Sequence, residues 1–341
     1  MRYLHMISLR WALLAPVGLL AALLVTAMLW ETFVVYLPDV READRVEMAN
    51  RLSDRLLDAM ASQARERGFT ASYLTKLKAG ERDNTLLQRI RTQRSEARTA
   101  MSGALEVARR LVREERVGEA FRNHLETVRE AREAVGPMRS RVEAGGVPPK
   151  AWFQSMTHLI LSASQLRLAA FLPEGAVEAA HYSNNMVKQA LWRAAEYAGR
   201  ERAALGQAIG AGRPLREAER ARLTGYRRIV DSQLEYLRDT APELYAAQGS
   251  RAAEEYGRAW RRVEETFLGR FQDLRKRVYA AAETGDYPVG AGEWLDASTE
   301  GIDTLFALGK VVDGRTARHV AAASTSSHRT LWIGAAMTVG S

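Results

Sequence analysis

Cysteine is absent from this sequence of 341 residues. Its absence excludes disulfides, thiolate metal sites and a cysteine nucleophile. The six histidines are scattered, with neither an HExxH motif nor an i, i+4 pair, so the sequence predicts no metal site. There is also no Gly-rich phosphate loop, and no serine or threonine has evident His and Asp support for nucleophilic catalysis. We therefore expect neither a cofactor nor an enzyme.

Proline occurs only nine times, and prolines and glycines together mark breaks in the hydrophobic pattern. Between the breaks, apolar residues recur with the 3.6-residue period of helices, and no strand pattern is convincing. These stretches are roughly 20 to 40 residues long, well above the helical mean of about 11. Long helices joined by short loops pack antiparallel, so the sequence predicts an all-α fold of helical bundles. The breaks lie at Gly80, Gly136, Gly145–Pro149, Pro173–Gly175, Gly210–Pro214, Pro242 and Gly285–Gly292.

The charge balance is basic, with 49 Lys and Arg against 41 Asp and Glu and a net charge of +8. Most of the excess is arginine, spread along amphipathic helices and not gathered into a basic tail. This pattern is typical of a solvated helix surface with many ion pairs. We therefore expect no nucleic-acid partner.

The N-terminal region contains an uncharged run of 20 residues from Trp11 to Trp30. At about 1.5 Å per residue, such a helix crosses the hydrocarbon layer of about 30 Å. Tryptophans at both ends suit the two membrane interfaces, and Arg2 and Arg10 before the run favour a cytoplasmic N-terminus. The alternative is a cleaved signal peptide with its site at 25–27. The apolar run continues past that site, which favours a membrane anchor.

The C-terminal residues are also apolar, from Leu331 to the last residue, Ser341. As a helix they span only about 16 Å, half of a membrane, which indicates the start of a second transmembrane helix. A cytoplasmic output domain would then follow. The predicted division is a cytoplasmic N-terminus over 1–10, a transmembrane helix over 11–36, an extracytoplasmic all-helical domain over 38–330, and the start of a second transmembrane helix over 331–341.

The extracytoplasmic region contains a repeat at an offset of 135 residues, which superposes residues 65–68 on residues 200–203. In each copy an arginine lies within an apolar stripe of one helix face, flanked by alanines. The stripes are Met60, Ala64, Arg67, Ala71 and Leu74, and Leu191, Ala195, Ala198, Arg202, Leu205 and Ile209.

A core-facing arginine needs a partner, because an unpaired buried charge costs several kcal/mol. One interpretation is an interhelical salt bridge from Arg67 or Arg202 to Glu66, Glu201 or Glu196. The other is a small anion held between two guanidinium groups, which are planar, charged and bidentate and so match planar oxyanions. Small neighbours of the arginines would then provide the cavity. The sequence leaves both open.

Residues 50–325 resemble the NIT domain, the nitrate- and nitrite-sensing domain of bacterial transmembrane receptors. The residues that carry the resemblance are Gln63-ARER-Gly68 followed by FTASYL, Glu196-YAGRER-Ala203 with Gly212 downstream, Gln233 in VDSQLEYL, and Trp294 in WLDASTEGIDTL. The sequence departs from the family pattern at Ala64, where a basic residue is common, and at Ala195, where a lysine often precedes the glutamate.

The resemblance implies two up-down four-helix bundles and a nitrate or nitrite site between helices. Its ligand residues would be Arg65 and Arg67 in the first motif and Arg202, with Arg200 beside it, in the second. The expected protein is a homodimeric sensor in the bacterial inner membrane. Its output would be a chemotaxis signalling domain, a histidine kinase or a diguanylate cyclase. The alternative is a membrane-tethered helical module that binds another protein and no small ligand.

Overall fold

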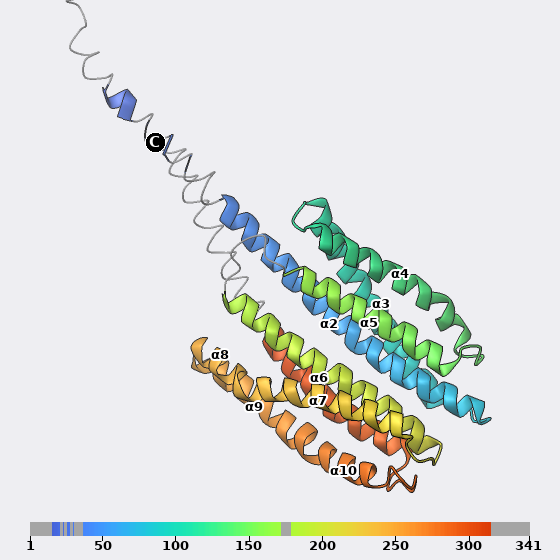
Figure 1. Cartoon of the computed structure of the whole chain (residues 1–341). Helices are drawn as coiled ribbons and strands as arrows, with labels where there is room; N and C mark the ends of the chain where they lie inside the picture. Colours follow the sequence, from blue (N-terminus) through green and yellow to red (C-terminus); the bar gives the residue numbers. More distant parts are fainter. Residues whose placement is uncertain are drawn as a thin grey trace, which may run out of the picture. The chain divides into compact units, whose positions relative to one another are not determined.

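The computed structural model describes residues 16–20, 23, 26, 27, 30, 37–171 and 179–314 (Figure 1). Every regular element among them is helical, which confirms the predicted all-α class. The elements are α2 (Leu37–Lys78), α3 (Asn84–Arg113), α4 (Glu119–Arg141), α5 (Pro149–Ala169), α6 (Ala179–Gly210), α7 (Glu217–Asp239), α8 (Ala241–Ala247), α9 (Ser250–Arg262), the π-helix η2 (Val263–Phe271), α10 (Gln272–Ala280) and a last helix over 291–314.

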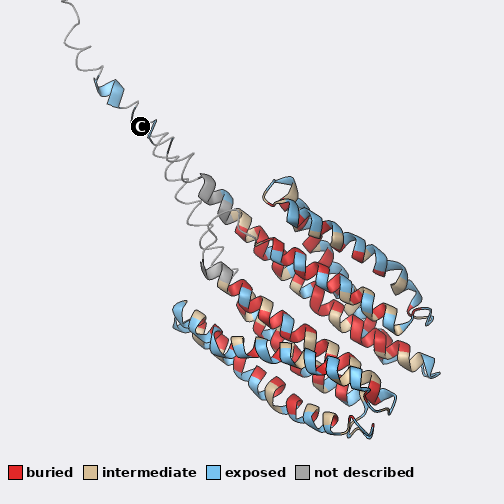
Figure 2. Cartoon of the chain, viewed as in Figure 1, coloured by how far each residue is buried: buried red, intermediate tan, exposed pale blue. Residues whose placement is uncertain are grey.

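Residues 49–316 form one compact unit, called here the helical unit. Within it α4 packs on α5 and α6 packs on α7, while α9, η2 and α10 continue one another. The outer helices α3, α4, α7 and α9 bury one face and expose the other, as the amphipathic pattern predicts, whereas α2 over residues 59–74 and α6 over residues 187–205 are buried on most sides (Figure 2). The burial of the apolar faces, including two fully buried tryptophans, Trp152 and Trp294, stabilises the unit.

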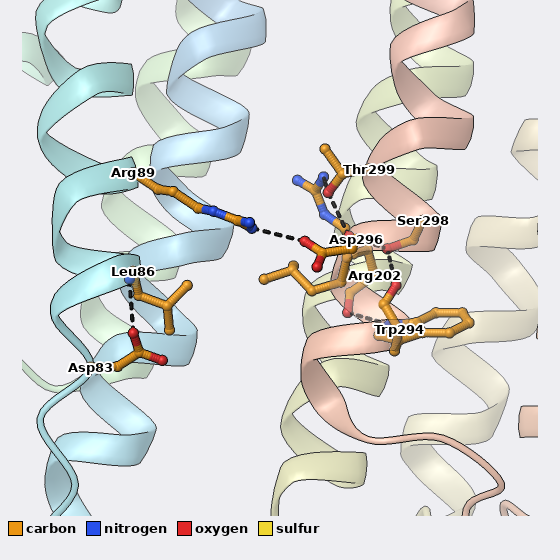
Figure 3. Close-up of polar contacts among 9 residues, drawn as sticks. Asp83, Leu86, Arg89, Arg202, Trp294, Asp296, Ser298 and Thr299 are labelled. Carbon is orange, nitrogen blue, oxygen red and sulfur yellow. Dashed lines mark hydrogen bonds and ion pairs between the residues drawn. The ribbon is translucent and has the colours of Figure 1, made fainter.

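The turns follow from local chemistry. The Asp83 side chain accepts a hydrogen bond of 2.9 Å from the Leu86 amide, which caps the start of α3 (Figure 3). Pro149 is the first residue of α5, where its missing N–H has no cost. At the turn before the last helix, Gly285 has φ +87°, and a side chain there would meet the backbone nitrogen of Pro214 at 2.9 Å.

Among the described residues, no helix is both long and apolar enough to cross a membrane. The predicted cytoplasmic segment 1–10 and the predicted second transmembrane segment 331–341 lie outside the described residues. Most of the predicted span over 11–36 lies outside them too.

Candidate functional site

Helices α2 and α6 run parallel through the helical unit, at the offset of the sequence repeat. Lys188 of α6 donates to Asp54 of α2 at 2.6 Å, and further along both helices Arg67 of α2 donates to Glu196 of α6 at 2.7 Å. The two copies of the repeated motif therefore face each other. This arrangement places Arg67 and Arg202 side by side between the two helices.

A tryptophan and a threonine hold each of these arginines by equivalent hydrogen bonds, and these four residues are called here the clamp residues. The Trp152 indole N–H donates to the Arg67 carbonyl at 3.2 Å, and the Trp294 indole N–H donates to the Arg202 carbonyl at 2.9 Å. The Arg67 guanidinium donates to the Thr157 hydroxyl at 2.9 Å. Likewise the Arg202 guanidinium donates to Thr299 at 2.8 Å (Figure 3).

The glutamates that precede the two arginines in sequence point to other partners. The Glu66 carboxylate accepts from Arg94 at 3.0 Å and from Arg139 at 2.5 Å. The Glu201 carboxylate accepts from Arg275 at 2.6 Å, and also from the Tyr279 hydroxyl. Each glutamate thus ties its motif to other helices of the unit, and neither hydrogen-bonds Arg67 or Arg202.

The two arginines differ in their counter-charge. Arg67 makes a bidentate ion pair with Glu196, at 2.7 and 3.0 Å, and Arg200 donates to the same carboxylate at 2.8 Å. Burial opposes ionisation of Glu196, but the charges and hydrogen bonds of Arg67 and Arg200 lower its pKa below the ordinary value. The salt-bridge interpretation therefore holds for Arg67, with Glu196 as the partner.

Arg202 is almost fully buried, with 2% of its surface exposed, and no described carboxylate hydrogen-bonds it. Desolvation, followed by repulsion from Arg67 and Arg65, lowers its pKa to about 10, although the charges of Asp303 and Glu196 oppose this shift. The residue that corresponds to Glu196 in the first copy of the repeat is Ala61. The two copies of the repeat thus differ: Arg67 has a hydrogen-bonded carboxylate, and Arg202 has none among the described residues.

Small residues allow the guanidinium groups to lie against the opposite helix. A Cβ atom at Gly68 would lie 3.3 Å from Nη2 of Arg202, and one at Gly199 would lie 3.9 Å from Nη2 of Arg67. The contacts are reciprocal, since each glycine faces the arginine of the other helix. Glycine at these two positions therefore leaves room for the guanidinium groups themselves.

The other two predicted arginines flank the central pair. Arg65 forms an ion pair of 2.5 Å with Asp303 of the last helix and lines a cavity of about 710 Å³. Arg200 lies over the Tyr197 ring at 4.7 Å and lines a second cavity, of about 570 Å³. The four arginines predicted from the sequence therefore lie on neighbouring turns of α2 and α6, with Arg65 and Arg200 at two different cavities, and only Arg67 and Arg200 share a partner.

Several guanidinium N–H groups at this place lack an acceptor among the described residues. They are Nε of Arg67, Nε of Arg202 and Nη2 of Arg200, all buried. Buried donors are rarely left unsatisfied. A small planar anion supplies the oxygen acceptors and the negative charge that these groups need, so the residues fit such a ligand. Among all the residues that the structure describes, no cluster of three or more His, Asp and Glu side chains could hold a metal ion.

Trp294 is among the residues that carry the family resemblance, but the clamp contacts were not predicted from the sequence, although a signal was present. Trp152 and Trp294 are each followed five positions later by a threonine, in WFQSMT and WLDAST. This shared spacing extends the repeat beyond the arginine motif. Asp303 has no such signal, because its role depends on how the last helix packs on α2.

These features define an all-helical domain with arginines buried between two parallel helices. Residues 58–321 match the family model described as nitrate and nitrite sensing. The chain therefore belongs to the NIT family, which confirms the resemblance stated from its motifs.

The fold is also similar to that of a solved structure, the NasR transcription antiterminator. The similarity has a TM-score of 0.63 at 14% sequence identity and covers 87% of this chain and 80% of that one. At this identity the likeness shows the fold alone. No curated protein sequence matches the chain.

Proposed function

We propose that the chain is a membrane-anchored sensor that binds nitrate or nitrite between α2 and α6 through Arg67 and Arg202, with Arg65 and Arg200 alongside. The observation that carries this proposal is the buried guanidinium of Arg202, which has a lowered pKa and no hydrogen-bonded carboxylate. A monovalent planar oxyanion relieves its repulsion with Arg67 and accepts hydrogen bonds from both groups. The family to which the chain belongs supports the choice of nitrate or nitrite.

The cavity beside Arg200 is the access route in this proposal. It is lined by Lys78, Lys150, Arg200 and Arg222, and by no described carboxylate. A cleft with charges of one sign concentrates the oppositely charged ligand and speeds its association. The cavity beside Arg65 is less suitable, because Asp58 is among the acidic residues that line it.

Signal transmission would use α2 and the last helix, which begin and end the helical unit. Arg65 of α2 pairs with Asp303 of the last helix, and Arg202 of α6 donates to Thr299 of that same helix. An anion at the arginines thus acts on all three helices at once. It can shift the equilibrium between two packings only by its difference in affinity, which is commonly about 1–3 kcal/mol.

The remaining parts of the proposal concern the membrane and the assembly. We propose that the helices form two up-down four-helix bundles in a homodimer, outside the inner membrane, with 11–36 and 331–341 leading into the membrane and an output domain beyond. The support lies in the apolar runs and in the arginines that precede the first run. The large apolar side chains described in that first run are 60–69% exposed: Val17, Leu19, Leu20, Leu23 and Trp30. A reporter fused after Ser341 tests this topology, and periplasmic activity of the reporter would contradict it.

Thermal melting with added anions tests the ligand proposal. We expect nitrate or nitrite, but neither chloride nor sulfate, to raise the melting temperature of the purified chain, because a ligand that binds only the folded state stabilises it. Arg67→Ala and Arg202→Ala should remove the shift. The matched control is Arg238→Ala, because Arg238 is exposed and pairs with the adjacent Asp239.

Absence of any anion-specific shift would refute the ligand proposal and favour a helical protein-interaction module. A shift that survives both central substitutions would place the anion elsewhere in the molecule.

A further inference from the structure

Glu196 already occupies the position of an anion at this site. Glu196 is 2% exposed, and its carboxylate accepts hydrogen bonds from both terminal nitrogens of Arg67 at 2.7 and 3.0 Å. A planar oxyanion would adopt the same bidentate geometry. An oxyanion cannot take these two hydrogen bonds while Glu196 holds them. Any ligand that uses the same edge of Arg67 must therefore compete with Glu196.

We propose that Glu196 is an internal competitor of the bound oxyanion and that it sets both the affinity and the charge selectivity of the site. This inference rests on the oxyanion function proposed above. It assigns to Glu196 a specificity role, distinct from the ligand role of the arginines.

The surroundings of Glu196 allow the exchange. Arg200 donates to Glu196 at 2.8 Å, so the carboxylate keeps a cationic partner after it releases Arg67. This matters because a buried carboxylate without a partner costs several kcal/mol. The Arg202 guanidinium lies against Gly68, the residue after Arg67, and its Nε has no partner among the described residues. An anion can therefore contact Arg202 first and complete its binding as Glu196 turns to Arg200.

Charge selectivity follows from the carboxylate that remains nearby. The repulsion between Glu196 and a divalent anion is twice that for a monovalent anion at the same distance. Glu196 thus favours nitrate or nitrite over sulfate. Without it, the four arginines would hold a dianion more readily.

The repeat offers a complementary test at Ala61, the position that corresponds to Glu196. Ala61 lines the cavity of about 710 Å³, which gives space for a longer side chain. Since α2 and α6 are parallel and their motifs face each other, a carboxylate at position 61 should reach Arg202 as Glu196 reaches Arg67. Ala61→Glu would then add a second internal competitor.

Isothermal titration of the purified chain with nitrate and with sulfate tests the proposal. We expect Glu196→Gln to bind nitrate roughly tenfold more tightly, because a like charge close to the anion is gone. Sulfate affinity should rise by a larger factor, so the preference for nitrate falls. The matched control is Glu201→Gln, since Glu201 is equally buried but bonded to Arg275 and Tyr279. Its selectivity should stay at the wild-type value.

An unchanged or weaker nitrate affinity in a folded Glu196→Gln chain would overturn this inference while the oxyanion function stands. If that variant does not fold, the test compares the nitrate affinity of Ala61→Glu with that of the neutral control Ala61→Gln. Nitrate binding roughly tenfold weaker in the glutamate variant supports the proposal, and equal affinities overturn it. A wild-type chain that binds neither anion refutes the oxyanion function itself, and this inference with it.

Discussion

The central arginines should affect stability in opposite directions when no anion is present. Arg202 is buried and repelled by Arg67 and Arg65, and its pKa is lowered to about 10. Because a tenfold change in an acid constant corresponds to about 1.4 kcal/mol, the charged form costs about 3 kcal/mol in the folded state. This cost applies at neutral pH and decreases only as the pH rises through about 10 towards the ordinary value of arginine.

Arg202→Met keeps an unbranched side chain about as long as the aliphatic part of arginine and removes the charge. It also loses the hydrogen bond to Thr299, which offsets about 1 kcal/mol of the gain. We expect the free energy of unfolding to rise by about 1–2 kcal/mol at pH 7 in a buffer without small oxyanions. At about 2–4 °C per kcal/mol for a unit of this size, the melting temperature should rise by several degrees. The same variant should lose all stabilisation by nitrate.

Arg67→Met should do the reverse. It leaves the buried Glu196 with Arg200 alone, and removal of one partner from a buried ion pair costs about 3 kcal/mol or more. Thermal and urea unfolding, followed by circular dichroism, measure both variants against the wild type. Equal destabilisation by Arg202→Met and Arg67→Met would refute the reasoning, since it would mean that a carboxylate compensates the charge of Arg202 as Glu196 does for Arg67.

Three further predictions concern other parts of the helical unit. Reversal of two exposed charges at the access route, Lys150→Glu with Arg222→Glu, should slow nitrate association in stopped-flow fluorescence and reduce its salt dependence, with little effect on dissociation. Burial raises the pKa of Asp313 to about 6; the charge of Lys188 opposes this shift, and the carboxylate of Asp54 adds to it. Because this pKa is raised, the contribution of Asp313 to stability is present at low pH and is lost as the pH rises from about 4 through 6, a dependence that Asp313→Asn should remove in melts across that range. Trp294→Phe should leave the Arg202 carbonyl without its indole donor and lower the free energy of unfolding by about 1–3 kcal/mol in urea titration.

The helices and the positions of their ends were predictable because each depends on residues close by in the sequence. Apolar spacing, Pro149 at the start of α5 and the Asp83 cap of α3 are all visible in short stretches of sequence. The repeat is equally visible, so helical spacing alone selects Arg67 and Arg202 as core-facing arginines. The Trp and Thr clamps are visible too, but only as a spacing shared between the two copies of the repeat.

The sequence by itself thus determined the all-α class, the duplicated motif and the arginines within apolar stripes, because helical periodicity and repetition are local properties of the chain. Only the tertiary structure decided which carboxylate neutralises which arginine. Three glutamates were equally plausible partners from the sequence, and the choice depends on the register and rotation of α2 against α6, which lie 129 residues apart at the Arg67–Glu196 contact. That register pairs Arg67 with Glu196, turns Glu66 and Glu201 towards other helices, and leaves Arg202 as the buried cation to which we assign the oxyanion.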